Sequence, residues 1–275
     1  MILDGKKLRD ELLVLYKERI NKERLNITLA IILVGDNEAS KLYIKNKEKY
    51  CSMVGINVRK YLLSKETSEE ELISLINDLN EDDDVTGIIL QSPVPNNIDF
   101  DKCSGLIKSS KDVDGFTKDN VYNLYLNRKS ILPCTVKGII KLLDCYKIDV
   151  SGKNVAIIGR GNIVGKPLAL ALENKDATVS LLHSKTKDLK DFTKNADIVV
   201  AACGVPKLLK ADMIKPGAVV IDVGISRTDA GIIGDIDFDN FKDIASFITP
   251  NPGGVGPMTV AMIIDNLIEM SELDE

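Results

Sequence analysis

The sequence has 275 residues, enough for one large domain or two smaller ones that each bury a hydrophobic core. Hydrophobic residues make up 44% and charged residues 28% of the chain, a balance typical of globular proteins. The net charge of -5 argues against nucleic acid or an anionic membrane as a partner, and no apolar run is long enough to span a bilayer.

Cysteine and histidine usage limits the kinds of site that the chain can carry. The five cysteines are scattered and include no Cys-x-x-Cys pair, which argues against a disulfide framework and against a zinc site. His183 is the single histidine, so a site with several histidine ligands is impossible and we expect no metal. The N-terminal stretch lacks the shape of a signal peptide. We therefore expect a reduced, cytoplasmic protein.

The first half of the chain alternates helical and strand patterns, which predicts an α/β layer sheet. The expected elements are, in chain order, a helix over 5–23, a buried strand at 27–35, a helix at about 40–54, a strand at 57–63, a helix that begins within 64–72, and a strand at 85–95. Gly55 is expected to cap the second helix, and Thr67 with Glu70 fits a capping box for the third. Residues 99–129 show no regular pattern.

A loop entering a helix at 133–148 is expected to cross between the domains, and a second series of strands and helices follows from residue 153. Its expected elements are strands at 154–159, 177–183, 196–204 and 218–224 and helices from about 165 and between the second and third strands. The stretch 251–270 is expected to be a Gly/Pro loop followed by a helix. We expect two α/β domains around a cleft, the second a Rossmann-like dinucleotide-binding domain.

The glycine-rich stretch GRGNIVG, residues 159–165, lies at a strand-to-helix junction. Glycines permit a tight turn and close backbone approach, and the N-terminus of the helix offers N–H groups to a pyrophosphate. The spacing G-x-G-x-x-x-G is one residue longer than the usual dinucleotide fingerprint, and a tight turn without a ligand is the plainer alternative.

The following strand indicates which dinucleotide binds. An NAD site usually places an acidic residue at the end of this strand, where it accepts hydrogen bonds from the ribose. Here the strand ends in His183, Ser184 and Lys185, and Arg160 lies in the glycine loop itself. Cations and a hydroxyl suit a 2′-phosphate, which favours NADP over NAD. Solvated surface is the plainer explanation for both cations, and His183 is better explained as a neighbour of the cofactor than as a catalytic base.

Four polar residues of the first half form a candidate catalytic cluster. Tyr43 and Lys47 share one face of an expected helix, whereas Lys45 and Lys49 point elsewhere. Gln91 ends an apolar strand, and ligands of open α/β sheets bind at the carboxyl ends of strands. Asp114 lies in the acidic turn KDVDGF. Each residue also has a plainer explanation, as helix surface, strand end or turn former.

Eight stretches of the sequence resemble the family of bifunctional methylenetetrahydrofolate dehydrogenase/cyclohydrolases, in the family's order and at its approximate spacing. They are VGDNEASKLYIKNKEKYCSMVGI (34–56), GIILQSPVP (87–95), KDVDGF (111–116), LPCTVKGII (132–140), GRGNIVGKPLA (159–169), VVIDVGI (219–225), GDIDF (234–238) and TPNPGGVGPMT (249–259).

The resemblance implies a role for each residue of the cluster. Lys47 matches the catalytic lysine, Tyr43 its partner one turn earlier, Gln91 the amide that touches the lysine, and Asp114 the carboxylate that holds the pterin ring. The residues implied to contact the folate substrate are Tyr43, Lys47, Gln91, Pro93, Asp114, Gly254 and Pro257.

The resemblance also implies a cofactor site and a division of the chain. Arg160 and Ser184 match the contacts to the 2′-phosphate of NADP. Gly161 departs from the family, which usually has serine there, so one hydrogen bond to phosphate is lost. The full set implied to contact the cofactor is Gly159, Arg160, Gly161, Ile163, Val164, Gly165, His183, Ser184 and Ile225. We expect residues 1–120 plus 256–275 to form the folate-binding catalytic domain and residues 121–255 the NADP-binding domain.

The activity implied is oxidation of 5,10-methylenetetrahydrofolate to the 5,10-methenyl form with NADP, followed by hydrolysis to 10-formyltetrahydrofolate. Lys47 can act as the general base only when it is neutral. A homodimer is expected from the family. Three alternatives stay open: a family member with dehydrogenase activity alone, a short-chain dehydrogenase, and a non-enzymatic dinucleotide-binding module. Chain order disfavours the short-chain dehydrogenase, because Tyr43 and Lys47 precede the glycine loop.

Overall fold

The computed structural model describes residues 1–228 and 231–272, and the chain divides into two compact units. The first unit comprises residues 10–134 and 260–275, and the second comprises residues 1–9 and 135–259. Each unit contains its own parallel β-sheet. The prediction of two α/β domains is therefore confirmed, while the functional assignment of the domains and the cleft between them stay predictions.

The first unit is built on a sheet of three parallel strands in the order β2-β1-β3. Its elements are α1 (Gly5–Glu23), β1 (Thr28–Val34), α2 (Glu38–Val54), β2 (Asn57–Leu63), α3 (Glu69–Glu81), β3 (Gly87–Leu90), α4 (Phe100–Ser104), the 3-10 turn η1 (Ser109–Lys111), α5 (Lys118–Tyr125) and α9 (Val255–Ser271). The first residues of α1 and of α9 belong to the second unit.

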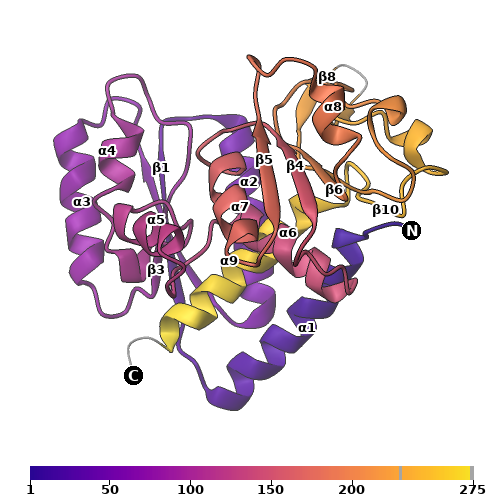
Figure 1. Ribbon diagram of the computed structural model, residues 1–275. Coiled ribbons are helices and arrows are strands. Elements are labelled where there is room, and N and C mark those ends of the chain that lie inside the picture. Colours follow the sequence, from indigo (N-terminus) through magenta and orange to yellow (C-terminus); the bar gives the residue numbers. More distant parts are fainter. Residues whose placement is uncertain (229–230, 273–275) are drawn as a thin grey trace. The chain divides into compact units, whose positions relative to one another are not determined.

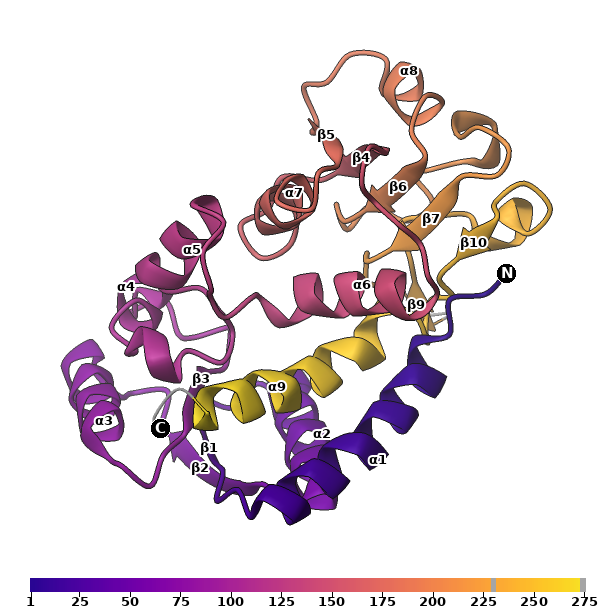
Figure 2. The same ribbon diagram turned by 60° about the horizontal axis from the view of Figure 1, so that its bottom comes forward.

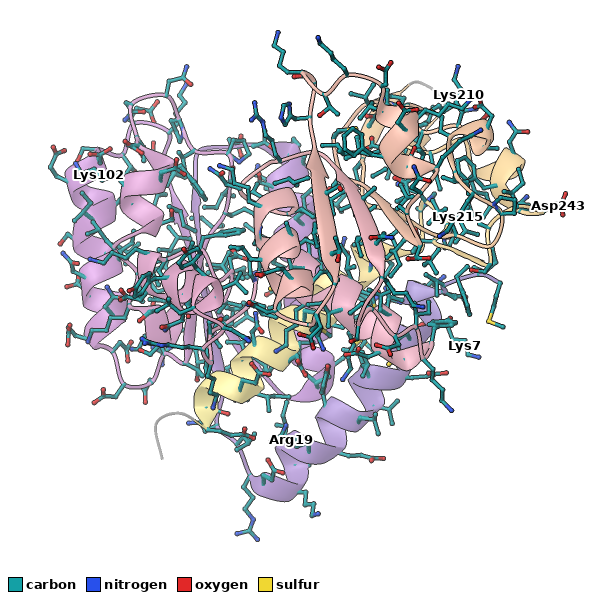
Figure 3. The ribbon with its side chains drawn as sticks, viewed as in Figure 1. Lys7, Arg19, Lys102, Lys210, Lys215 and Asp243 are labelled. Carbon is teal, nitrogen blue, oxygen red and sulfur yellow. The ribbon has the colours of Figure 1, made fainter. Side chains whose placement is uncertain are left out.

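Helices cover both faces of this sheet. Figure 2 shows α3 on one side of the strands and α2 and α9 on the other. Every residue of β1 is buried, as expected for a central strand with both faces covered. On the α3 side, Leu72, Ile76 and Leu79 recur at helical spacing and pack against the strands. An ion pair between Lys102 of α4 (Figure 3) and Glu69 of α3 joins these two helices, with Nζ and Oε1 2.5 Å apart.

The second unit is built on a sheet of five parallel strands in the order β10-β7-β6-β4-β5. Its elements are α6 (Cys134–Cys145), β4 (Asn154–Ile158), α7 (Gly165–Glu173), β5 (Thr178–Leu182), α8 (Leu189–Thr193), β6 (Ile198–Ala201), η2 (Ala211–Met213), β7 (Val219–Asp222), β8 (Ser226–Thr228), β9 (Gly231–Ile233), η3 (Phe238–Phe241) and β10 (Phe247–Ile248). Figure 1 shows β4, β5 and β6 side by side in this unit.

The strand order of the second unit fixes where a ligand is expected. β4 pairs with β5 on one side and with β6 on the other, so the direction of the chain's progress across the sheet reverses between β4 and β6. In open α/β sheets, ligands bind outside the carboxyl ends of the strands at such a reversal. The loops that follow β4 and β6 are residues 159–164 and 202–210, and the first of them is the glycine loop.

The structure corrects several local expectations. The helix α3 is capped by Ser68 and Glu71, not by Thr67 and Glu70, because the backbone N–H of Thr67 is used in a preceding turn to Ser64. Residues 99–129 contain α4, η1 and α5 instead of irregular chain. The strand expected at 85–95 is limited to Gly87–Leu90, and the short strands β8, β9 and β10 were not anticipated.

Two further features bear on the expectations from composition. None of the five cysteines forms a disulfide, and Cys51, Cys103 and Cys134 are buried. Within the described residues, no helix is both long enough and apolar enough to cross a membrane.

Candidate active site

The buried stripe of α2 determines which lysine of this helix is directed inward. Ser40, Ile44, Cys51 and Val54 are the buried residues of α2, and Lys47 falls between Ile44 and Cys51 at the spacing of the same stripe. Lys47 is accordingly half-buried, whereas Lys45 and Lys49 are exposed. The helix is fixed at both ends, by the side chain of Asn37 at its N-terminus and by left-handed Gly55 at its C-terminus.

Lys47 contacts Gln91 directly. Its Nζ donates a hydrogen bond of 3.0 Å to Gln91 Oε1. The orientation of the Gln91 amide is defined, since its Nε2 donates to the carbonyl oxygen of Ser92 at 2.8 Å. That carbonyl also accepts from the Ser40 hydroxyl at 3.3 Å, which ties the end of β3 to the start of α2. Gln91 therefore presents an acceptor, and not a donor, to the lysine.

The turn that carries Asp114 is held by a second, deeper carboxylate. Asp112 is 3% exposed, and it accepts from the N–H of Gly115 at 2.9 Å and of Thr117 at 2.7 Å. Asn120 of α5 donates to the same carboxylate at 3.1 Å. Gly115 has a φ of +69°, and a Cβ there would lie 2.5 Å from a backbone oxygen of residue 131. These hydrogen bonds and the close packing at Gly115 hold the turn around Asp114 in a single conformation.

Helix α9 supports the same turn from behind. Asn266 is fully buried, and its Nδ2 donates to the carbonyl oxygens of Val113 at 2.9 Å and Leu132 at 3.0 Å. The backbone on either side of Asp114 is thus held by hydrogen bonds, so the position of its carboxylate is set by the fold of the first unit.

The electrostatics of Asp114 reflect its partial burial. Burial raises the pKa of its carboxyl, and the charge of Asp112 acts in the same direction, while the ammonium group of Lys47 opposes them. Lys47 and Asp114 are therefore close enough to interact through their charges. The first unit thus holds the cation of Lys47, the oriented amide of Gln91 and the carboxylate of Asp114.

For the other residues expected at the substrate site, the structure gives position and exposure. Tyr43 is 46% exposed, one turn before Lys47 on α2, and Pro93 is exposed just beyond Gln91. Gly254 and Pro257 belong to the second unit, and their part in substrate binding stays a prediction.

The sequence did not lead us to expect roles for Asp112 and Asn120. An Asp followed three residues later by Gly is a recognised turn signal, and it was available in KDVDGF.

The glycine loop of the second unit has the packing that a pyrophosphate site needs. Gly159 has a φ of +116°, and a Cβ there would collide with the carbonyl of Ala202. A Cβ on Gly165 would collide with the carbonyl of Gly159. Gly161, by contrast, has open space around it. Helix α7 begins at Gly165 without a side-chain cap. In its first turn Pro167 has no N–H and the N–H of Lys166 donates to the carbonyl of Gly161 at 3.1 Å, which leaves the N–H of Gly165 for a ligand.

The residues expected around the 2′-phosphate and nicotinamide lie at the carboxyl ends of β4, β5 and β7. Arg160, Ile163 in the glycine loop, Ser184 and Ile225 after β7 are exposed. Val164, the residue before α7, is half-buried. His183 is held by a local turn, where its Nδ1 accepts from the N–H of Lys185 at 3.2 Å. His183 therefore lies in the same turn as Ser184, and the part of both residues in cofactor binding stays a prediction.

The described part of the chain holds no group of three or more His, Cys, Asp or Glu side chains arranged for a metal ion. The candidate chemistry of the first unit is thus that of a lysine, an amide and a carboxylate.

Comparison with known proteins gives one consistent family. Residues 3–114 match the sequence model of the tetrahydrofolate dehydrogenase/cyclohydrolase catalytic domain, and residues 133–275 match that of the NAD(P)-binding domain of the same family. The bifunctional protein FolD of Campylobacter hominis is 48% identical over 98% of this chain and 97% of its own length.

Solved structures agree with this match. The bifunctional FolD enzyme of Campylobacter jejuni superposes with a TM-score of 0.97 at 46% identity, covering 100% of this chain and 99% of that one. The Trypanosoma brucei methylenetetrahydrofolate dehydrogenase-cyclohydrolase, solved with NADP and an inhibitor, gives a TM-score of 0.93 at 34% identity and covers 100% of this chain and 98% of its own.

Proposed function

The chain belongs to the tetrahydrofolate dehydrogenase/cyclohydrolase family that its motifs resemble, and we propose that it catalyses both reactions of that name. It would oxidise 5,10-methylenetetrahydrofolate to the 5,10-methenyl form with NADP and hydrolyse that product to 10-formyltetrahydrofolate. The observation that carries the proposal is the 3.0 Å contact between Lys47 Nζ and Gln91 Oε1, in the unit that also holds Asp114. Family membership removes the short-chain dehydrogenase alternative.

The residues of the second unit fit an NADP molecule. The close packing at Gly159 and Gly165 leaves backbone where side chains would otherwise stand, and the start of α7 offers the N–H of Gly165 to the pyrophosphate. Arg160 supplies a cation and Ser184 a hydroxyl for the 2′-phosphate. NADP, when bound, accepts the hydride that leaves the methylene carbon.

Asp114 has the chemistry to orient the folate. A carboxylate accepts two parallel N–H bonds from an amidine-like edge such as that of the pterin ring. Because Asp112 and Asn266 fix the turn around it, Asp114 would hold the pterin in one orientation with little loss of side-chain freedom. Hydride transfer depends on this placement more than on acid–base groups.

Lys47 has the chemistry to activate water in the second step. A neutral amine takes a proton from water as the water oxygen bonds to the methenyl carbon. The bond between this carbon and N5 then breaks, N5 takes up a proton as the new hydroxyl group gives one up, and the formyl group remains on N10. Gln91 Oε1 accepts from the lysine and aims it, and its Nε2 is engaged with Ser92, so the amide cannot rotate freely.

Replacement of Lys47 by Met tests this assignment. Loss of general-base catalysis is worth roughly 100-fold to 10,000-fold, so we expect Lys47→Met to lose at least about 100-fold in cyclohydrolase rate. Dehydrogenase activity should persist in the variant, because the lysine is not needed for hydride transfer. Formation and decay of the methenyl product are followed by absorbance with NADP and, separately, with NAD.

Lys45→Met is the matched control, since Lys45 lies two residues away on the exposed side of α2. It should keep both activities. Full cyclohydrolase activity in Lys47→Met would refute the role of the lysine. A wild-type protein that forms the methenyl product but never hydrolyses it would instead identify a dehydrogenase alone, and cofactor binding without turnover would favour a non-enzymatic module.

A homodimer in the cytoplasm completes the proposal. The edge strand β2 offers one surface for self-association, because it has a free edge and Leu62 on it is 66% exposed. Light scattering coupled to size-exclusion chromatography should give twice the mass of one chain. Cell fractionation should place the protein with cytoplasmic markers, in keeping with five cysteines that form no disulfide.

A further inference from the structure

Two buried carboxylates of the second unit have no part in the chemistry described so far. Asp222 ends β7 in the stretch VVIDVGI, and Asp235 lies in the stretch GDIDF. Asp222 is 2% exposed and Asp235 is 0% exposed. Aspartate is rarely buried to this degree unless its oxygens have hydrogen-bond partners, so the contacts of each residue indicate what it does.

Asp235 holds the loop that follows β6. Its Oδ2 accepts from the backbone N–H of Cys203 at 2.7 Å and of Gly204 at 2.9 Å. The Cys203 thiol donates to the same oxygen at 3.3 Å. Three donors from two consecutive residues thus converge on one carboxylate oxygen. Asp235 Oδ1 has no hydrogen-bond partner among the described residues.

The loop held by Asp235 is the wall against which the glycine loop packs. The carbonyl of Ala202 fills the space where a side chain on Gly159 would stand. The loops after β4 and β6 flank the reversal of strand order, where the cofactor is expected. Displacement of residues 202–204 would therefore move the backbone that bounds the pyrophosphate site.

Asp222 holds the loop that follows β7 and joins it to Asp235. Its Oδ1 accepts from the N–H of Gly224 at 3.1 Å and from the N–H of Asp235 at 2.9 Å. Each of the two carboxylates also packs against a glycine close to the other aspartate. The Asp235 carboxylate fills the space beside Gly224, and the Asp222 carboxylate fills the space beside Gly234, so neither glycine can carry a side chain.

We propose that Asp222 and Asp235 are positioning residues that fix the cofactor-facing loops 202–204 and 223–225 before NADP binds. The inference rests on the proposed function, because it assigns these loops to the NADP site. Asp235 acts through the backbone of residues 203 and 204, and Asp222 acts through Asp235 and Gly224. Neither carboxylate needs to touch the cofactor.

The surroundings argue against two other roles, a metal site at Asp222 and Asp235 and a reactive thiol at Cys203. A metal site would need a third ligand, and the described residues offer no such cluster. A reactive thiol would need a lowered pKa, whereas burial and the neighbouring Asp235 raise the pKa of Cys203 to about 11. Cys203 is therefore a protonated donor to Asp235.

The affinity for NADP, measured by calorimetry in the absence of folate, tests the proposal. Hydrogen bonds to a charged group contribute about 1.5–3 kcal/mol, which corresponds to roughly 10-fold to 100-fold in an equilibrium constant. We expect Asp235→Ala to raise the Kd for NADP by at least about tenfold, with kcat at saturating NADP changed far less. Asp235→Asn keeps an acceptor oxygen for residues 203 and 204 and should restore most of the affinity.

Thr193→Val is the matched control for a merely structural effect. Thr193 is fully buried in α8 of the same unit, and its hydroxyl donates to the carbonyl of Met213 at 2.5 Å. The variant should lower the melting temperature while leaving the Kd for NADP unchanged. An unchanged Kd in Asp235→Ala, an equal loss in Thr193→Val, or no recovery in Asp235→Asn would each overturn the proposal.

Hydrogen exchange of the wild-type protein gives a second test that needs no variant. If Asp235 fixes the loop in advance, the amides of Cys203 and Gly204 should be protected without NADP and change little when it is added. Exchange at the rate of an open loop before NADP is added would overturn the proposal. A wild-type protein that binds no NADP at all would refute the proposed function instead, so the two failures are distinguishable.

Discussion

Lys47 and its neighbours show how one helix separates a buried lysine from exposed ones. The inward stripe of α2 passes through Lys47 and misses Lys45 and Lys49, as helical spacing predicts. The sequence could not reveal how Gln91 is oriented, because that depends on the carbonyl of Ser92. The catalytic roles of these residues stay predictions until the variants are measured.

Asp114 should make folate binding sensitive to acid. Burial raises the pKa of its carboxyl above the ordinary value of 3.8, so protonation on acidification begins at a higher pH than for an exposed aspartate. The KM for the folate should therefore rise as the pH falls through that range, while the KM for NADP stays flat. Asp114→Asn should raise the folate KM by roughly 10-fold to 100-fold at neutral pH and abolish this dependence. An identical pH profile in Asp114→Asn would contradict the assignment.

Asp222 should make the folded state more stable in acid. Burial raises the pKa of its carboxyl from 3.8 to about 6, with the charge of Asp235 acting in the same direction. Between these values the unfolded chain loses the proton and the folded chain keeps it, so stability falls as the pH rises from about 4 to about 6. Above that range both states are ionised and the loss is complete, at about 3 kcal/mol.

The Asp222→Asn variant lacks this titration, which provides the measurement. Urea denaturation at pH 4 and pH 7 should show that the wild type loses about 2 kcal/mol more than the variant over this interval, because part of the loss has already occurred at pH 4. The variant will be less stable than the wild type at pH 4, because its amide oxygen can accept from Gly224 and Asp235 but its NH2 group replaces Oδ2, which accepts from the N–H of Ile236 at 3.4 Å. An equal change in both proteins would mean that Asp222 titrates normally.

At the scale of elements, long periodic segments were predicted well and short ones were not. Helix α1 occupies the expected range 5–23, and α7 begins at the expected Gly165. By contrast, α4 has five residues and β10 has two, which is too short for a helical or alternating period to show. The capping residue of α3 was misplaced by one position because Thr67-Glu70 and Ser68-Glu71 offer overlapping capping boxes.

The glycine loop allows a paired prediction, because its glycines differ in their surroundings. A methyl group on Gly159 would collide with the Ala202 carbonyl in a left-handed backbone conformation, whereas the space around Gly161 is open. Gly159→Ala should destabilise the second unit and lose most NADP affinity. Gly161→Ser should fold normally and gain up to about tenfold in NADP affinity through one added hydrogen bond to phosphate.

Melting temperature and calorimetric Kd values for the two variants distinguish these effects. Gly161→Ala serves as the control, since it adds the same carbon without the hydroxyl and should leave the Kd close to that of the wild type. A loss of folding in Gly161→Ala would show that the loop is tighter than its packing indicates.

At the scale of the whole molecule, the course of the chain between the two units is the feature that local patterns do not contain. The first unit begins at residue 10, ends at residue 134 and is completed by residues 260–275. The expectation that the C-terminal helix returns to the first domain came from the family resemblance and not from periodicity. Helix α9 is apolar over most of its surface, which identifies a buried helix without indicating what covers it.

Replacement of Asn266 tests whether helix α9 stabilises the first unit. It is the fully buried polar residue of α9, and it connects the helix to the carbonyls of Val113 and Leu132. Asn266→Leu keeps the volume but removes the donors, which leaves buried carbonyl groups without these partners and should cost roughly 2–4 kcal/mol. Asn77→Leu, at an exposed position of α3, should change the free energy of unfolding by less than about 0.5 kcal/mol.

Urea denaturation measures both variants, and the folate KM of Asn266→Leu shows whether the destabilisation reaches the site. Because Asn266 holds the backbone next to Asp114, the KM for the folate should rise while the Kd for NADP, a property of the second unit, stays unchanged. If both constants changed equally, the helix would be acting on the whole molecule and not on the turn that carries Asp114.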